Sequence, residues 1–135
     1  MRHILTALSL ALIATTASAA PFQNGSFESG TLANTGSFDS LSAGSTAITG
    51  WTVTGDGVDY MDTYWVAANG TRSIDMLSCG TAGGVQQTFD TLPGAIYQVT
   101  FSVAGNPDGG IKTLTASAAA STANFTFDTA GATAS

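Results

Sequence analysis

Apolar and polar residues alternate with a period of two along much of this chain. The clearest case is residues 96–103, where apolar residues at 97, 99, 101 and 103 alternate with polar residues at 98, 100 and 102. Alternation of this kind is typical of a β-strand with one buried face and one face in water. The same pattern predicts further strands at residues 48–54, 58–64, 72–77, 84–91, 112–118 and 124–129.

Clusters of Gly, Asn, Asp and Pro separate these segments, and no long segment has the 3.6-residue period of an amphipathic helix. We therefore predict an all-β fold, an antiparallel β-sandwich. Residues 28–47, rich in Ser, Thr, Gly and Ala, are expected to form a long loop over the sandwich edge. The last strand pattern, residues 125–128, ends seven residues before Ser135 with no closing strand, which suggests that the sandwich lacks its last strand.

The first residues of the chain have a different character. Arg2 precedes ten uncharged residues, 4–13, and the small-residue run 17–19 follows. This layout is typical of a secretory signal peptide, and ten residues are too few for the roughly 20 that cross a bilayer as a helix. We expect a signal peptide over residues 1–19 and one domain over 20–135. The mature chain would be secreted or at the cell surface, without membrane insertion, and would cross the periplasm if the envelope is Gram-negative.

Removal of the signal peptide leaves a strongly acidic chain. Only Arg72 and Lys112 then remain to balance nine carboxylates, so the net charge is −7. Such a surface repels nucleic-acid phosphates and anionic lipid headgroups, because both attract proteins through Lys and Arg. Nucleic acids and membrane surfaces are therefore excluded as expected partners.

The mature chain also contains no histidine, since His3 is the only one in the sequence. This excludes a Ser-His-Asp triad, a Cys-His pair and a His-ligated catalytic zinc. Cys79 is the only cysteine, so an intrachain disulfide is excluded as well. We therefore expect that the protein is not an enzyme.

Carboxylates are the remaining catalytic candidates. A glycosidase needs two of them facing each other across a sugar, about 5 to 9.5 Å apart. Asp56, Asp59 and Asp62 have a spacing of three, which places neighbours on opposite faces of a strand, so we interpret them as turn and rim residues. A hydrolase that uses Asp59 or Asp75 is the third hypothesis for function.

Three aromatic residues at the end of the predicted strand 58–64 are candidate ligand contacts. Tyr60, Tyr64 and Trp65 together would form an aromatic rim. A flat ring can stack on the apolar face of a sugar while an indole N–H donates a hydrogen bond. The alternative is that such a ring packs in the core, as the alternation predicts for Trp51.

The Asn-Pro-Asp-Gly-Gly loop at 106–110 offers a similar choice. Asn106 and Asp108 can present oxygens to an ion or a sugar hydroxyl. The same residue types are also favoured in a plain turn.

Several segments in a fixed order resemble a known family. They are NGSFE at 24–28, ITGW at 48–51, VDY at 58–60, GTRSIDM at 70–76, GVQQTF at 84–89 and YQVTFSVAGNPDG at 97–109. Their order is similar to that in the domain-of-unknown-function family 642, and the later segments resemble its bacterial relatives, the choice-of-anchor C proteins. The resemblance covers nearly all of residues 21–131.

The resemblance implies a galactose-binding-like jelly roll, a fold shared with many carbohydrate-binding modules, and a role at the cell surface or in the extracellular matrix. Catalysis is not implied. In similar modules the glutamate of the opening Asn-Gly-x-Phe-Glu segment helps to hold a structural calcium ion, and Glu28 matches it. The second carboxylate of such sites comes from the final strand, and family members end in a sorting anchor. This sequence shows neither.

We therefore expect a secreted, non-catalytic module that binds a cell-wall or extracellular polysaccharide, with structural calcium at Glu28 as its one candidate cofactor. The candidate ligand contacts are Tyr60, Tyr64, Trp65, Asn106 and Asp108. The alternative is a structural or adhesive protein of the extracellular matrix or cell envelope. Such a protein would contact envelope or matrix proteins through a sheet face or an exposed edge.

Overall fold

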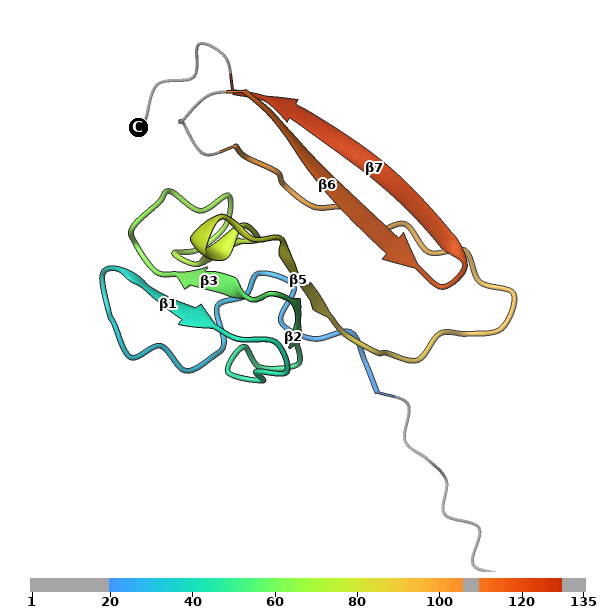
Figure 1. Ribbon diagram of the computed structural model, residues 1–135. Helices are drawn as coiled ribbons and strands as arrows, with labels where there is room; N and C mark the ends of the chain where they lie inside the picture. Colours follow the sequence, from blue (N-terminus) through green and yellow to red (C-terminus); the bar gives the residue numbers. More distant parts are fainter. Residues whose placement is uncertain (1–19, 106–109, 130–135) are drawn as a thin grey trace, which may run out of the picture.

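The computed structural model describes residues 20–105 and 110–129 (Figure 1). Their elements are β1 (Phe38–Leu41), β2 (Thr52–Gly55), β3 (Val58–Met61), β4 (Ser73–Asp75), the 3₁₀ turn η1 (Ser78–Gly80), β5 (Gly83–Gln86), β6 (Ile111–Ala118) and β7 (Ser121–Asp128). Every strand pairing among them is antiparallel. The predicted fold class, all-β with antiparallel sheets, is therefore confirmed.

One prediction about the chain falls outside this description. Residues 1–19 are not described, so the signal peptide stays a prediction. Within the described ranges, no helix has the length and apolar character needed to cross a membrane.

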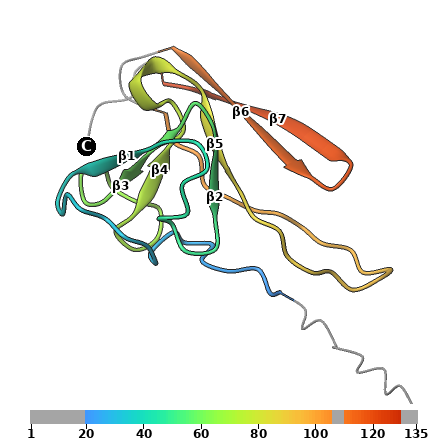
Figure 2. The same cartoon turned by 60° about the horizontal axis from the view of Figure 1, so that its bottom comes forward.

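The strands form three small sheets. β3 is the centre of a three-stranded sheet with the order β1-β3-β4, while β2 pairs with β5 and β6 pairs with β7. The β6–β7 hairpin lies to one side of the other two sheets in both views (Figures 1 and 2). The chain therefore consists of a core built from β1 to β5 and a hairpin beside it.

The core is centred on β3. All four of its residues are buried, and Ile48 and Val53 are buried with them. A strand with neighbours on both edges can pair its backbone N–H and C=O groups. Val58 and Tyr60 are therefore buried without leaving backbone groups unpaired. β3 therefore fixes the positions of the segments on either side of it.

The structure corrects two sequence-based expectations. The region 28–47, expected to be a loop, contains β1, which pairs with β3 in the register Phe38↔Met61 to Leu41↔Val58. Residues 96–103, the clearest strand pattern, do not form a strand, and residues 96–105 make no backbone hydrogen bond to another described residue. Alternation selects which side chains share a face, whereas a strand also needs a partner for its N–H and C=O groups.

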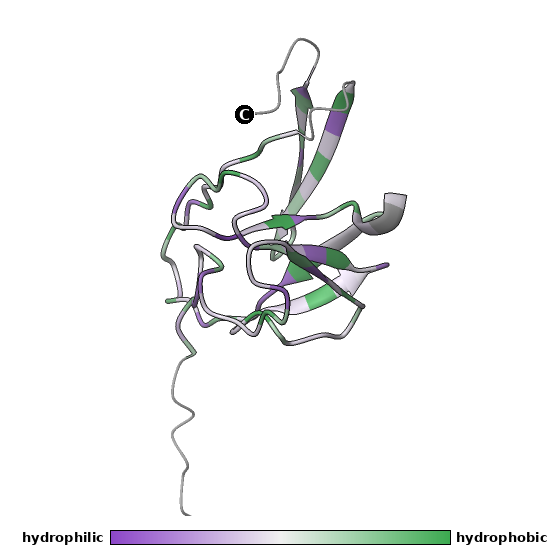
Figure 3. Ribbon diagram, turned by 90° about the vertical axis from the view of Figure 1, so that its left-hand side faces the viewer, coloured by the Kyte–Doolittle hydropathy of each residue, from purple (hydrophilic) through white to green (hydrophobic). Residues whose placement is uncertain are grey.

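The β6–β7 hairpin agrees with the predicted strands 112–118 and 124–129. Its register runs from Ile111↔Asp128 to Ala118↔Ser121, and Ala119 in the turn has a φ of 50°. Hydrophobic and hydrophilic residues alternate along it (Figure 3).

Candidate functional site

The Glu28 carboxylate joins the first segment of the described chain to the end of the 62–72 connection, which links β3 to β4. Its Oε1 accepts hydrogen bonds from the Thr71 N–H at 3.0 Å and the Arg72 N–H at 2.8 Å, and its Oε2 accepts one from the Thr71 hydroxyl at 3.1 Å. The Arg72 N–H above all, with the two Thr71 donors and the Arg72 charge, holds the pKa of the Glu28 carboxyl below its usual value. A charged Glu28 therefore positions this end of the connection.

Gly70 allows the carboxylate to approach this closely. Its φ is +69°, and a Cβ atom there would lie 2.4 Å from the Glu28 carboxyl group. Only glycine meets both conditions without strain.

Asn24 organises the same first segment. Its side-chain amide donates to the carbonyls of Ser29 and Thr49 at 2.7 and 2.9 Å, and its Oδ1 accepts from the Ser29 N–H at 3.0 Å. The indole N–H of Trp51 donates to the Asn24 carbonyl at 3.0 Å, and the Trp51 ring packs on Phe27 at 5.2 Å between centroids. These contacts hold Glu28 in place.

Arg72 and Tyr60 form the inner part of this arrangement. The Tyr60 hydroxyl donates to the Phe27 carbonyl at 2.5 Å and accepts from Arg72 Nη1 at 2.7 Å. The same nitrogen donates to the Gly30 carbonyl at 3.4 Å, and the guanidinium lies 5.1 Å from the Tyr60 ring centroid. The hydrogen bond to Tyr60 above all raises the pKa of Arg72. Arg72 is therefore a structural cation.

Tyr60 consequently cannot contact a ligand. Its side chain is fully buried, with 0% exposed. The hypothesis that Tyr60 belongs to an exposed aromatic rim is wrong, because the central strand β3 places it in the core. Asn106 and Asp108 lie outside the described residues, so their role as contacts stays a prediction.

Tyr64 and Trp65 do lie at the surface, on the 62–72 connection. Tyr64 is 56% exposed, Trp65 is half-buried, and their ring centroids are 5.8 Å apart. Phe38 of β1 supports Tyr64 from the side at 5.6 Å. A hollow of about 210 Å³ lies beside Trp65, lined by Thr63, Trp65, Val66, Ala67, Gly70 and Thr71. The connection therefore presents the Trp65 ring next to two threonine hydroxyl groups, with the Tyr64 ring on the neighbouring surface.

The Glu28 carboxylate, the candidate calcium ligand, is engaged by hydrogen-bond donors. Calcium takes six to eight oxygen ligands, whereas both oxygens of this carboxylate accept from N–H or O–H donors. Among the described residues, no group of three or more Asp, Glu, His or Cys side chains is arranged to hold a metal ion. Calcium at Glu28 stays a prediction that these contacts do not support.

Asp59 and Asp75 face each other across β3 and β4, as their register shows. Asp59 is only 8% exposed, and its Oδ1 accepts from the hydroxyls of Ser40 and Ser78 at 2.6 and 2.8 Å. The interpretation of Asp59 as a turn or rim residue is therefore wrong. Its carboxylate joins β1 and the η1 turn to the central strand.

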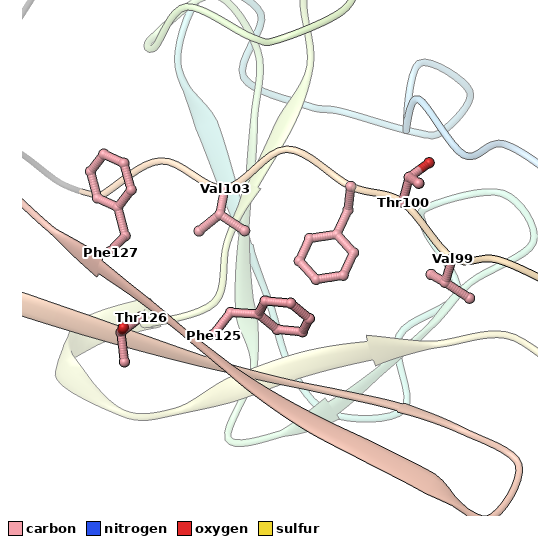
Figure 4. A pocket seen from close by; sticks show the side chains of 7 residues that line it. Val99, Thr100, Val103, Phe125, Thr126 and Phe127 are labelled. Atoms are coloured by element: carbon pink, nitrogen blue, oxygen red, sulfur yellow. The ribbon is translucent and has the colours of Figure 1, made fainter.

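A second hollow, of about 350 Å³, lies between residues 99–103 and β7 (Figure 4). Val103 points toward β7 and Thr100 points away from it, so the predicted alternation of faces is preserved even without a strand. The Phe101 and Phe125 rings meet edge to face at 5.0 Å. We call this hollow the apolar groove; its apolar lining residues are Val99, Phe101, Val103, Phe125 and Phe127.

A family model described as "Protein of unknown function (DUF642)" matches residues 20–135. This chain belongs to the DUF642 family. The resemblance to domain-of-unknown-function family 642 is thereby confirmed. In this DUF642 chain, two of the segments that carry the resemblance, 24–28 and 70–76, meet at Glu28.

A curated relative of this DUF642 chain is halomucin from Haloquadratum walsbyi (strain DSM 16790 / HBSQ001). The two are 39% identical over 87 residues, which cover 62% of this chain and 1% of halomucin. The chain thus corresponds to a very small part of that protein. No solved structure matches it.

Sequence reasoning missed the contacts of Glu28 and Arg72 in this DUF642 fold. The composition held a clue, because residues 20–135 contain one glutamate and one arginine. A rare charge in a polar, glycine-rich chain is a candidate for a specific hydrogen-bonding role. The partners themselves lie 43 and 44 residues from Glu28, which no local pattern reveals.

Proposed function

We propose that this protein is an exported, non-catalytic module that binds a cell-wall or extracellular polysaccharide through Tyr64 and Trp65. The observation that carries the proposal is that Trp65 lines the hollow at 63–71 and that the exposed ring of Tyr64 lies 5.8 Å from the Trp65 ring. Aromatic faces stack on the apolar faces of sugar rings, and the indole N–H can donate to a sugar oxygen. The hydroxyls of Thr63 and Thr71 border the same hollow and can hydrogen-bond to sugar hydroxyls.

The site is held in a way that suits binding. The Glu28 hydrogen bonds fix one end of the 62–72 connection, and β3 fixes the other end. A loop ordered in advance loses less entropy when a ligand binds. These contacts that order the connection do not involve the Tyr64 and Trp65 rings.

Export and the absence of catalysis belong to the same proposal. The family match begins at residue 20, the residue that follows the expected signal peptide. No histidine occurs after His3, so catalytic constellations that need a histidine are missing from residues 20–135. In the finer form of the proposal the chain is a choice-of-anchor C relative with a galactose-binding-like jelly roll.

Retention on insoluble polysaccharides tests the proposal. The exported protein is incubated with a panel of cell-wall and extracellular polysaccharides, and the bound fraction is measured by depletion. We expect Trp65→Ala and Tyr64→Ala each to weaken retention about tenfold or more, as loss of a central aromatic contact does. Tyr97→Ala is the matched control, because Tyr97 is 51% exposed and lies outside this hollow. No retention on any polysaccharide, or equal losses with Tyr97→Ala, would contradict the proposal.

A second candidate function is favoured by the apolar groove. Phe101, Phe125 and Phe127 offer apolar rings without a polar group, which suits a protein surface better than a sugar. On this alternative the protein is a structural or adhesive component of the extracellular matrix or cell envelope, and it contacts protein partners through the groove.

A further inference from the structure

Residues 20–23 lie along residues 87–90, the segment that continues β5. Gln23 and Gln87 are joined twice, because the Gln23 N–H donates to Gln87 Oε1 at 2.7 Å and Gln87 Nε2 donates to the Gln23 carbonyl at 2.9 Å. Phe22 meets Phe89 edge to face at 5.3 Å. The first described residues are therefore attached to the domain at successive points.

The outermost attachment joins Ala20 and Asp90. The Asp90 N–H donates to the Ala20 carbonyl at 2.8 Å, and the backbone nitrogen of Ala20 donates to Asp90 Oδ2 at 2.5 Å. Ala20 is also the residue at which the mature chain is expected to begin. Its nitrogen is a neutral amide while residue 19 is attached and becomes a primary amine when that bond is hydrolysed.

We propose that processing between Ala19 and Ala20 creates an ion pair between the new α-ammonium group of Ala20 and the Asp90 carboxylate. Water adds across the peptide bond, so that Ala19 leaves with a carboxylate and Ala20 keeps the nitrogen. A free α-amino group is mostly protonated at neutral pH, since its ordinary pKa is about 7.7 to 8.0. The nitrogen already lies at hydrogen-bond distance from Asp90, so cleavage adds a charge there without requiring movement.

The ion pair between Ala20 and Asp90 matters in this chain because the chain contains few other cations. Residues 20–135 contain two basic side chains and nine carboxylates, and Arg72 is engaged with Tyr60 and Gly30. A charge-assisted hydrogen bond is stronger than one from a neutral amide. Removal of the signal peptide would therefore strengthen the attachment of the mature N-terminus to the domain. This inference rests on the export part of the proposed function and not on polysaccharide binding.

The first test identifies the N-terminus. The full chain is expressed in a secreting bacterial host, and the released protein is examined by intact mass and N-terminal sequencing. We expect Ala20 as the first residue. Release at another residue, or retention of the leader, overturns the proposal while leaving polysaccharide retention to be judged by its own assay.

The second test is a double-mutant cycle on the exported protein. One change inserts a serine between Ala19 and Ala20, which moves the new amino group one residue away from Asp90, and the other is Asp90→Asn. We expect the insertion to lower the thermal unfolding midpoint at pH 6 and low salt by about 2 to 4 °C, as for an exposed ion pair in a domain of this size. In the Asp90→Asn chain the insertion should lower it by less than about 1 °C.

High salt provides a further arm of the cycle, because it screens exposed charges. We expect 1 M NaCl to shrink the effect of the insertion in the Asp90 chain. Equal effects of the insertion with Asp90 and with Asn at position 90 would overturn the ion pair, as would no effect in either.

Discussion

Polar side chains near the 62–72 connection hold the fold together at the scale of single residues. Glu28 and Arg72 carry opposite charges but do not simply attract each other through space. The carboxylate binds backbone N–H groups, and the guanidinium binds a buried tyrosine hydroxyl and a carbonyl. In a small core these directed hydrogen bonds supply part of the order that a larger apolar interior would give.

Glu28→Gln tests this role of the charge. The variant keeps one acceptor oxygen but loses the charge, so we expect a loss of about 1 kcal/mol in the free energy of unfolding. Because folding lowers the pKa of Glu28, its contribution is fully present above the usual value of 4.5 and is lost as pH falls through the lower folded pKa. Urea unfolding of both proteins between pH 3 and 7 should show curves that converge on acidification.

Asp56→Asn is the control for this experiment, because Asp56 lies exposed in the turn between β2 and β3. A difference between Glu28→Gln and the natural protein that stays constant down to pH 3 would contradict the role assigned to the carboxylate.

At the scale of elements, close backbone contacts decide which strands can pair. β2 and β5 pair through Gly55 and Gly83, and a Cβ atom at Gly83 would lie 1.5 Å from the Gly57 carbonyl oxygen. No side chain can move to relieve such a contact, because the obstacle is backbone. The glycines that the sequence offers as loop residues are here part of a sheet.

Gly83→Ala should therefore push β5 away from Gly57, in the turn between β2 and β3. We expect a loss of about 2 kcal/mol or more in the free energy of unfolding, because the added methyl group forces the backbone apart. Gly84→Ala is the matched control, since its Cβ would meet only the Thr54 hydroxyl, at 3.0 Å. Chemical denaturation of both variants measures the difference, and similar losses would contradict the assigned contact.

The same scale shows what the sequence could and could not predict. Alternation at 112–118 and 124–129 predicted the two strands β6 and β7, and the structure pairs them across a short turn because they are neighbours in sequence. It failed at β1, where Phe38 and Leu41 bracket two polar residues, Asp39 and Ser40, and the partner β3 lies about 20 residues away. At 96–103 the pattern predicted the shared face but not the missing partner. The exposure of Tyr64 agrees with its predicted place near a strand end, while its role and that of Trp65 as ligand contacts stay predictions. The hydrogen-bond partners of Glu28 are distant in sequence, so no local pattern predicts them.

At the scale of the whole molecule, the acidic charge opposes association between copies of the chain, whereas the apolar groove favours it. The net charge of −7 on residues 20–135 keeps copies apart, yet the stretch from 91 to 105 contains no charged residue. Association between copies would therefore depend on this uncharged side of the molecule and would be favoured by salt.

Sedimentation velocity over a range of concentrations tests this expectation. We expect a rise in sedimentation coefficient with concentration that is larger in 0.5 M NaCl, and we expect Phe125→Ser to remove it because Phe125 lines the apolar groove. Ile96→Ser is the control, since Ile96 is 98% exposed and lies outside the groove. An equal effect of both variants would show that general hydrophobicity, not the groove, drives association.

The contacts of residues 20–28 also set an order of events in time. Ala20, Gln23 and Glu28 find their hydrogen-bond partners 70, 64 and 43 residues further along the chain. A chain that emerges N-terminus first cannot complete these contacts until Asp90 has followed, and closing such long loops slows folding. In an exported protein, the first mature residue to leave the cell would thus be among the last to reach its folded position. The unfolded chain would depend on chaperones during export.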